Sequence, residues 1–176
     1  VEQTQKQKEK RAHRMRSHDC AASADDRVLF LKGWPMSEFI QNSGCVILSG
    51  DKILLLFKRK HAHYEFPGGK MEPGETIHET AIRETREEIG VDVKLGDYLG
   101  YLEFHINDRD YRSHNFFGII APGQNPRVME PEIFSELIWM PMHQYRTFPL
   151  AKNVFEFCEN YAKTGQLFLP NAKTHF

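Results

Sequence analysis

The 176 residues, 40% of them hydrophobic, suffice for one domain with a substantial core. The 23 lysines and arginines against 24 aspartates and glutamates give a formal net charge of -1, so no overall basic field argues for a nucleic-acid polymer as partner. No apolar run approaches the ~20 residues of a membrane span, and the chain opens without the apolar core of a signal peptide. Three scattered cysteines without CxxC spacing favour a reducing compartment. We therefore expect a cytoplasmic monomer or homodimer with no membrane contact.

The beginning of the chain differs in composition from the rest. VEQTQKQKEKRAHRMRSH is polar, basic and almost free of large apolar side chains, which predicts a disordered or loosely helical extension over residues 1-35. Residues 36-170 are predicted to form the folded domain, and residues 171-176 a tail. A basic arm could touch RNA or an acidic surface, but a solvated tail is the simpler interpretation.

The folded part opens with two apolar runs, GCVILSGDKILLLFKRK, separated by the turn residues 49-52. This arrangement predicts a β-hairpin. The second run, residues 53-57, is continuously apolar and predicts a strand covered on both faces. A loop through Pro67, Gly68 and Gly69 follows.

A helix is predicted from Glu75 to Ile89. The segment Thr76 to Glu79 has the form of a capping box, and Gly90 is a typical C-terminal stop. Each helical residue turns the side chain by ~100°, so residues four apart share a face. The predicted buried stripe contains Ile77, Ala81, Thr85 and Ile89, with Ile82 beside it.

Strands and a second helix are predicted after this helix. VDVKLGDYLGYLEFHI and YRSHNFFGIIA flank the polar turn 107-110 and suggest a β-meander, and SELIWMP suggests a further strand. The closing helix LAKNVFEFCENYAKTG has a predicted apolar stripe of Ala151, Val154, Phe155, Cys158 and Tyr161. The expected fold is an α/β or α+β sandwich, with helices on the faces of a mixed sheet.

Three glutamates cluster near the end of the first helix. Glu84 and Glu88 fall just off one edge of the buried stripe, and Glu87 lies further round the same flank. Their oxygens suit magnesium or manganese, and a cation would relieve their mutual repulsion. For this segment alone, a solvated acidic face with Arg83 and Arg86 in helix ion pairs would be the simpler interpretation.

The glycine loop before the helix changes that interpretation. Gly68 and Gly69 allow a close approach of backbone to phosphate or metal. The spacing fits the pattern G-x5-E-x7-R-E-U-x-E-E-x-G-U, where U is apolar, at Gly69, Glu75, Arg83, Glu84, Glu87, Glu88 and Gly90. This stretch resembles the Nudix box of the Nudix hydrolases. Thr85 departs from the pattern at the first U position, and Val91 satisfies the second.

The resemblance implies a Nudix-type α/β/α sandwich and a hydrolase that cleaves a nucleoside diphosphate linked to another group. By the same resemblance, Mg2+ or Mn2+ is held by Glu84, Glu87 and Glu88, often with the carbonyl of Gly68. Such ions neutralise a diphosphate and lower the pKa of an attacking water. Arg83 would orient a glutamate, and Glu75 would brace the loop.

The general base is left open by the resemblance. Glu84 or Glu87 is possible within the box, and Glu130, Glu132 and Glu136 lie in the later loop, with Glu132 preferred. Three histidines could also be proposed as acids or bases, but each is more simply a surface or packing residue: His105, His114 and His143.

The local sequence is most similar to the MutT-like subgroup, which converts nucleoside triphosphates to the monophosphate and pyrophosphate. Lys152 stands near the turn where the bacterial MutT pattern has a base-reading asparagine, so specificity for 8-oxo-dGTP is not implied. The expected substrate contacts are Gly69, Lys70, Phe117 and Lys152. The enzymatic alternatives are dinucleoside polyphosphate (Ap4A-type), ADP-ribose and nucleotide-sugar hydrolysis. The alternative of another class is a non-catalytic nucleotide-binding regulator, which the complete set of box glutamates disfavours.

Overall fold

A computed structural model of the protein describes residues 39-169. The predicted extension over residues 1-35 and the predicted tail over residues 171-176 lie outside this range. The described elements are β1 (Phe39–Ser49), β2 (Lys52–Lys58), β3 (His63–Glu65), β4 (Gly68–Lys70), α3 (Ile77–Ile89), β5 (Val93–Ile106), β6 (Arg109–Ile120), β7 (Phe134–Pro141), the 3-10 helix η1 (Met142–Thr147) and α4 (Lys152–Thr164). Neither α3 nor α4 is long and apolar enough to cross a membrane, and they are the α-helices of the described range.

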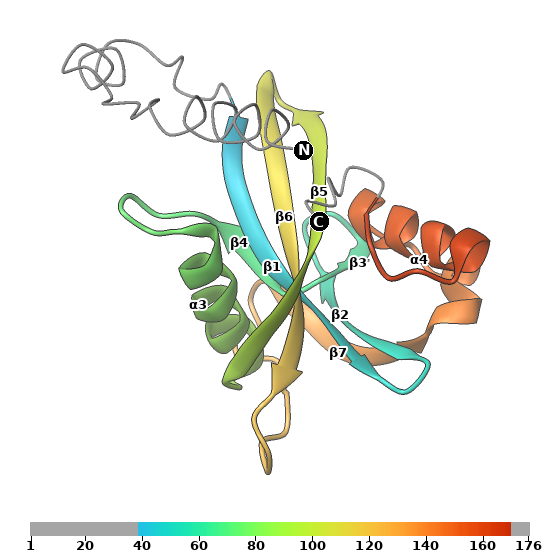
Figure 1. Cartoon of the computed structure of the whole chain (residues 1–176). Helices are drawn as coiled ribbons and strands as arrows, with labels where there is room; N and C mark the ends of the chain where they lie inside the picture. Colours follow the sequence, from blue (N-terminus) through green and yellow to red (C-terminus); the bar gives the residue numbers. More distant parts are fainter. Residues whose placement is uncertain (1–38, 170–176) are drawn as a thin grey trace, which may run out of the picture. The chain divides into compact units, whose positions relative to one another are not determined.

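The strands form one mixed sheet in the order β3-β2-β1-β6-β5, with β4 added beside β1 and β7 beside β2. β1 and β6 run parallel, while the other pairings are antiparallel. The predicted class, a mixed sheet with helices on its faces, is confirmed. Figure 1 shows α3 and α4 on opposite sides of this sheet.

The predicted hairpin is confirmed. Ser49 pairs with Lys52, and Gly50 takes the left-handed backbone conformation (φ 60) that the tight turn requires. The four residues from Ile53 to Leu56 are each 0% exposed, so β2 is covered on both faces as its continuous apolar run predicts. Burying each such side chain contributes roughly 2 kcal/mol.

Two hydrophobic cores, one on each side of the sheet, hold the helices in place. The core under α3 is built from Cys45, Ile47, Leu54, Leu56, Ala81, Ile89, Val91, Val93, Phe116 and Phe134. The core under α4 contains Val46, Ile53, Leu55, Tyr64, Phe66, Leu99, Met140, Met142, Tyr145, Val154, Phe157, Cys158 and Leu169. Successive residues of β1 and β2 therefore point into different cores. The core on the α3 side holds this helix over the glycine loop.

The segment after α3 corrects two expectations. The β5–β6 turn contains only Asn107 and Asp108, both with positive φ (49 and 57), rather than the four predicted residues. Such a pair matches the right-handed twist of a hairpin. β6 also pairs with β1 in parallel, so the segment is not a simple meander.

The closing helix ends at Gly165 as predicted (φ 70), but its buried face differs from the predicted stripe. Val154 and Cys158 are buried, and Phe157 is buried with them, whereas Phe155 is 39% exposed and packs its ring on Tyr145. The reason is geometric: Phe157 follows Val154 by three residues and lies near it on the helix surface.

Candidate active site

The helix that carries the box glutamates has well-formed ends. The Glu79 N–H donates to the Thr76 hydroxyl at 3.3 Å, and the Thr76 N–H donates to the Glu79 carboxylate at 2.8 Å, so the predicted capping box is confirmed. At the other end Gly90 takes the left-handed conformation, and its N–H donates to the Arg86 carbonyl. These caps fix where α3 starts and stops.

The orientation of α3 about its own axis buries one of its glutamates. Ala81, Thr85 and Ile89 are buried as predicted, while Ile77 and Ile82 are only half-buried. Along the edge of this stripe, Glu88 is 4% exposed and Glu84 is half-buried, whereas Glu87 lies at the surface. The three carboxylates thus run from the protein interior to solvent along one flank.

The buried carboxylate of Glu88 is bonded to the glycine loop. The N–H of Gly68 donates to Oε2 of Glu88 at 2.8 Å. Burial raises the pKa of Glu88 well above its ordinary value, and the Gly68 bond offsets this only in part. A buried carboxylate of this kind costs free energy when ionised unless a cation compensates it.

The second carboxylate, that of Glu84, lies directly over Gly69. A Cβ added at position 69 would come within 2.5 Å of the carboxylate carbon of Glu84. Burial raises the pKa of Glu84, and the hydrogen bond and charge of Arg83 oppose that rise. Gly69 is therefore needed for space, which gives a structural reason for the glycine that opens the box.

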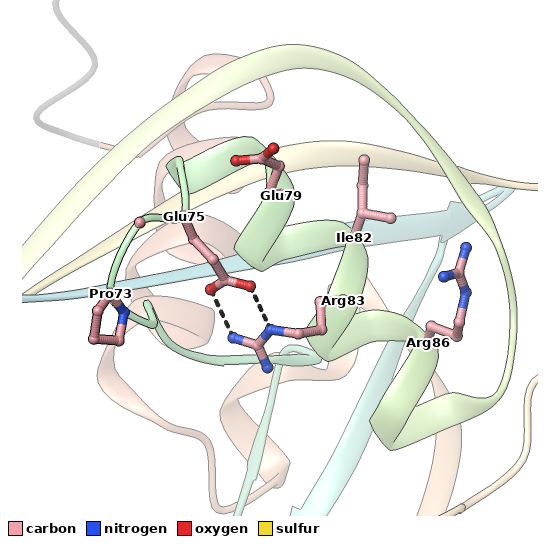
Figure 2. A pocket seen from close by; sticks show the side chains of 7 residues that line it. Pro73, Glu75, Glu79, Ile82, Arg83 and Arg86 are labelled. Carbon is pink, nitrogen blue, oxygen red and sulfur yellow. Dashed lines mark hydrogen bonds and ion pairs between the residues drawn. The ribbon is translucent and has the colours of Figure 1, made fainter.

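Arg83 connects the remaining members of the box. Its guanidinium donates to Glu75 at 2.6 and 2.9 Å, to Glu84 at 2.8 Å, to Glu87 at 2.9 Å and to the carbonyl of Lys70 at 3.1 Å. The Arg83 bonds to Glu75, together with a hydrogen bond from the Glu72 N–H, lower the pKa of Glu75 to about 2. Figure 2 shows the paired Glu75 and Arg83 side chains. The geometry is consistent with Glu75 bracing the loop and Arg83 orienting the glutamates, roles that stay predictions.

The loop after β6 is anchored to the end of α3. The Arg127 and Met129 N–H groups donate to the carbonyls of Ile89 and Glu88, at 3.0 and 2.9 Å, and satisfy acceptors that a helix end leaves free. Glu130 follows at once, and its charge contributes to the raised pKa of Glu84.

The other two loop glutamates have different surroundings. Glu132 is exposed, and no hydrogen bond or ion pair of residues 39-169 engages its carboxylate. The Glu136 carboxylate accepts a 2.8 Å hydrogen bond from the Tyr64 hydroxyl. Of the three loop glutamates, Glu130 is thus the one whose charge acts on a glutamate of the box, Glu84.

A charged pair beside Glu88 was missed by sequence reasoning. Lys58 Nζ lies 2.6 Å from Glu65 Oε1, and both charges act on the pKa of Glu88. Their pairing depends on β2 and β3 lying side by side, which the sequence does not show. The sequence feature that could have pointed to this pair is the position of Glu65, three residues before Gly68.

The other predicted substrate residues have varied settings. Lys70 is exposed, Phe117 packs partly buried against the core under α4, and Lys152 is 63% exposed at the start of α4, 3.6 Å from Glu156. No hydrogen bond or ion pair within the described range joins these three side chains to α3. Their role in binding remains a prediction.

The three histidines have partners of their own. His105 pairs with Asp110 at 2.8 Å, His114 with Tyr98 and Gln41, and His143 lies at the surface, 4.0 Å from Asp51. These contacts agree with structural or surface roles.

A hollow of about 490 Å³ lies on the outer side of α3 and is lined by Pro73, Gly74, Glu75, Glu79, Ile82, Arg83 and Arg86. Figure 2 shows these side chains. The lining includes none of Glu84, Glu87 and Glu88, so this hollow is not the predicted metal site. We place the candidate site at the three carboxylates and the Gly68–Gly69 loop, because the buried charge lies there.

The donor set at this place fits a divalent ion that prefers oxygen. Glu84, Glu87 and Glu88 offer carboxylate oxygens, Gly68 offers a carbonyl, and burial raises the pKa of Glu84 and of Glu88. Within residues 39-169 no three acidic, histidine or cysteine side chains are already gathered tightly enough to hold an ion. Glu84 and Glu87 instead share the Arg83 guanidinium.

Comparison with known proteins identifies the family. The NUDIX domain model matches residues 39–161, most of the chain. This chain belongs to the NUDIX family. The predicted family, fold and enzyme class, a Nudix pyrophosphohydrolase acting on acid anhydrides, are thereby confirmed.

Similar proteins support a place near the MutT-like members. An uncharacterized Nudix hydrolase of Bacillus subtilis strain 168, YvcI, is 31% identical over 111 residues, which cover 62% of this chain and 70% of YvcI. A second B. subtilis protein, whose name proposes 8-oxo-dGTP diphosphatase activity, is 35% identical over 88 residues, 49% of this chain and 57% of its own length. The MutT protein of Methanosarcina mazei Go1 has the same fold, with a TM-score of 0.64 and 21% identity over 73% of this chain and 96% of its own.

Membership of the family gives the reaction class. The Nudix domain of this chain acts on substrates that contain a nucleoside diphosphate linkage, and enzymes of this family generally use a divalent metal.

Proposed function

We propose that this protein hydrolyses a nucleoside triphosphate, canonical or oxidised, to the monophosphate and pyrophosphate with Mg2+ or Mn2+. The observation that carries the proposal is the graded row of carboxylates on α3 beside the Gly68–Gly69 loop, with Glu88 buried and bonded to Gly68. The similarity to a B. subtilis protein named for 8-oxo-dGTP supports a triphosphate substrate. The free, buried thiols of Cys45 and Cys158 support a cytoplasmic location.

The residues proposed to hold the metal are Glu84, Glu87 and Glu88, together with the carbonyl of Gly68. When bound, a divalent ion neutralises the diphosphate and lowers the pKa of the attacking water. Arg83 keeps the Glu84 and Glu87 side chains on the same flank through its 2.8 and 2.9 Å contacts. Arg83 is itself fixed by Glu75, so the orientation of the two glutamates depends on the loop before α3.

For the general base we propose Glu130. Its carboxylate would accept the proton of the attacking water as the water oxygen bonds to phosphorus and the bridging P–O bond breaks, with pyrophosphate leaving. Two backbone bonds hold this position, because the Ile133 and Phe134 N–H groups donate to the Glu130 carbonyl at 3.0 and 2.9 Å. The influence of Glu130 on Glu84 supports its closeness to the box. Glu132 remains the prediction from sequence.

A substrate panel tests the proposal. The protein is incubated with Mg2+ and with dNTPs, 8-oxo-dGTP, Ap4A, ADP-ribose or a nucleotide sugar, and products are resolved by chromatography. We expect monophosphate and pyrophosphate from one or more triphosphates. Release of ATP and AMP from Ap4A as the dominant reaction would replace the triphosphate by a dinucleoside polyphosphate. Nucleotide binding without turnover on any member would instead indicate a regulatory module.

A further inference from the structure

A basic turn joins β2 to β3. The basic turn is defined here as residues 58-63, which comprise Lys58, Arg59, Lys60, His61, Ala62 and His63. The N–H groups of His61 and Ala62 both donate to the Lys58 carbonyl, at 3.3 and 2.9 Å. Ala62 has a φ of 51, a left-handed conformation that residues other than glycine rarely adopt. The turn therefore has a defined backbone shape, set by local bonds.

Three of its charged or titratable residues serve to fix the turn in place. Lys58 Nζ and His63 Nε2 contact the two carboxylate oxygens of Glu65, at 2.6 and 3.3 Å. Arg59 donates from its side chain to the carbonyl of Pro131 and from its backbone to that of Ile133, both at 3.0 Å. The basic turn is thus attached to the loop that carries Glu130.

The side chains of Lys60 and His61 take no part in this network. Both are exposed, and within residues 39-169 no hydrogen bond or ion pair engages the Lys60 ammonium or the ring nitrogens of His61. The His61 ring stacks on His63 with 5.4 Å between centroids, which holds it at the tip of the turn. Partial burial and the positive charge of His63, Lys58 and Lys60 lower the pKa of His61. The tip therefore presents unsatisfied donors in a locally positive field.

The start of the turn lies near the carboxylate site, because Lys58 pairs with Glu65, three residues before Gly68, and the Gly68 N–H is bonded to Glu88. Lys58 and Glu65 both influence the pKa of Glu88, so the start of the turn lies within electrostatic reach of the buried carboxylate. A bound substrate would place its cleaved diphosphate at the acidic residues of α3. Any further phosphoryl group would carry negative charge past that cluster, where only a neighbouring cationic surface favours it.

We propose that the tip of the basic turn, Lys60 and His61, binds a phosphoryl group of the substrate that lies outside the cleaved diphosphate. The ammonium and the imidazole N–H would donate to non-bridging phosphate oxygens, as charge-assisted bonds do. This inference rests on the proposed function, because it takes the α3 carboxylates as the place of cleavage. With this contact, the basic turn favours substrates with triphosphates or longer phosphate chains over diphosphates.

Kinetics on paired substrates test the inference. KM and kcat are measured for the best nucleoside triphosphate and its diphosphate with wild type, Lys60→Ala, His61→Gln and the double variant. We expect KM for the triphosphate to rise about tenfold in the double variant, with kcat and the diphosphate KM within twofold of wild type. Lys94→Ala, which removes an exposed lysine of β5, is the matched control. An equal change on both substrates, or none, would overturn the assignment.

A binding measurement separates this inference from the proposed reaction. Inorganic tripolyphosphate and pyrophosphate are titrated calorimetrically into wild type and the double variant without divalent metal. Weaker tripolyphosphate binding in the double variant, with pyrophosphate binding unchanged, supports the turn even if no nucleotide is hydrolysed. Unchanged tripolyphosphate binding refutes it. Inositol hexakisphosphate forms a third arm: binding that is tighter than tripolyphosphate and lost in the double variant would assign the site to a phosphorylated inositol instead of a nucleotide chain.

Discussion

The carboxylate of Glu84 occupies the space into which any side chain at Gly69 would project. All three terminal atoms of Glu84 lie within 2.6 Å of a Cβ built on Gly69. Gly69 itself is not among the positive-φ glycines, so alanine fits its backbone. We predict that Gly69→Ala folds with a Tm close to wild type, because the flexible end of Glu84 can move, but loses most turnover, because Glu84 leaves its position. Thermal unfolding and kcat measure the two effects.

Gly68→Ala serves as the contrasting variant. The backbone of Gly68 has a φ of +155, and a Cβ there would lie 2.6 Å from the Gly44 Cα and 2.7 Å from the Ser43 carbonyl. Main-chain atoms of β1 cannot yield as a side chain can, so this variant should lose stability as well as activity. Equal stability losses in the two variants would contradict the role assigned to Glu84 displacement.

A second prediction separates the charge of Glu88 from its structural bond. Glu88→Gln keeps an oxygen that can accept the Gly68 N–H, but it removes a buried negative charge. Without metal we expect stability equal to or above wild type, because burial disfavours the ionised form. With Mg2+ we expect turnover to fall on the order of 100-fold or more. Glu72→Gln, at an exposed position before α3, is the control. Near-normal turnover in Glu88→Gln would remove Glu88 from the ligand set.

Local signals made the frame of this site predictable. The caps of α3 and its buried stripe depend on side chains within a few residues of each other, so Thr76, Glu79 and Gly90 were sufficient to locate the helix. The β1–β2 turn is equally local. The burial of Phe157 in place of Phe155 shows the limit of such local signals. The flank of an apolar stripe that becomes buried depends on the neighbouring element that packs on the helix.

Long-range pairing explains what the sequence does not show. β3 and β4 have three residues each, too few for a periodic pattern, and Gly68 and Gly69 join the sheet only because β1 lies beside them. The parallel pairing of β1 with β6 has no local signature. The Lys58–Glu65 pair and the link of Arg59 to Pro131 arise from the same packing.

A third prediction concerns acid stability and His114. Tyr98 donates its hydroxyl to Nδ1 of His114 at 2.7 Å, and Nε2–H donates to Gln41 at 2.9 Å, which fits the neutral ring. Burial, with a contribution from Arg112, lowers the pKa of His114 to about 4. Between the ordinary value of 6.5 and this one, the unfolded chain binds the additional proton, so stability falls as pH falls through that window.

The effect can be measured with one substitution. After a discount for partial exposure, the wild type should lose about 2 kcal/mol through His114 between pH 7 and pH 4. In His114→Gln this part of the pH dependence should vanish, whereas the exposed His143→Gln should retain it. Urea unfolding at pH 7, 5.5 and 4.5 is the measurement. Parallel curves for wild type and His114→Gln would show that His114 titrates normally.

The last prediction decides between the two loop glutamates. Glu130 is half-buried and influences Glu84, whereas Glu132 is exposed and unpaired within the described residues. If Glu130 accepts the proton of the attacking water, Glu130→Gln should lower kcat by roughly 100-fold or more, with KM little changed. Glu132→Gln should leave kcat within about twofold of wild type. The reverse pattern, with kcat lost in Glu132→Gln and kept in Glu130→Gln, would assign the base to Glu132, and a kcat kept by both variants would place the base within α3.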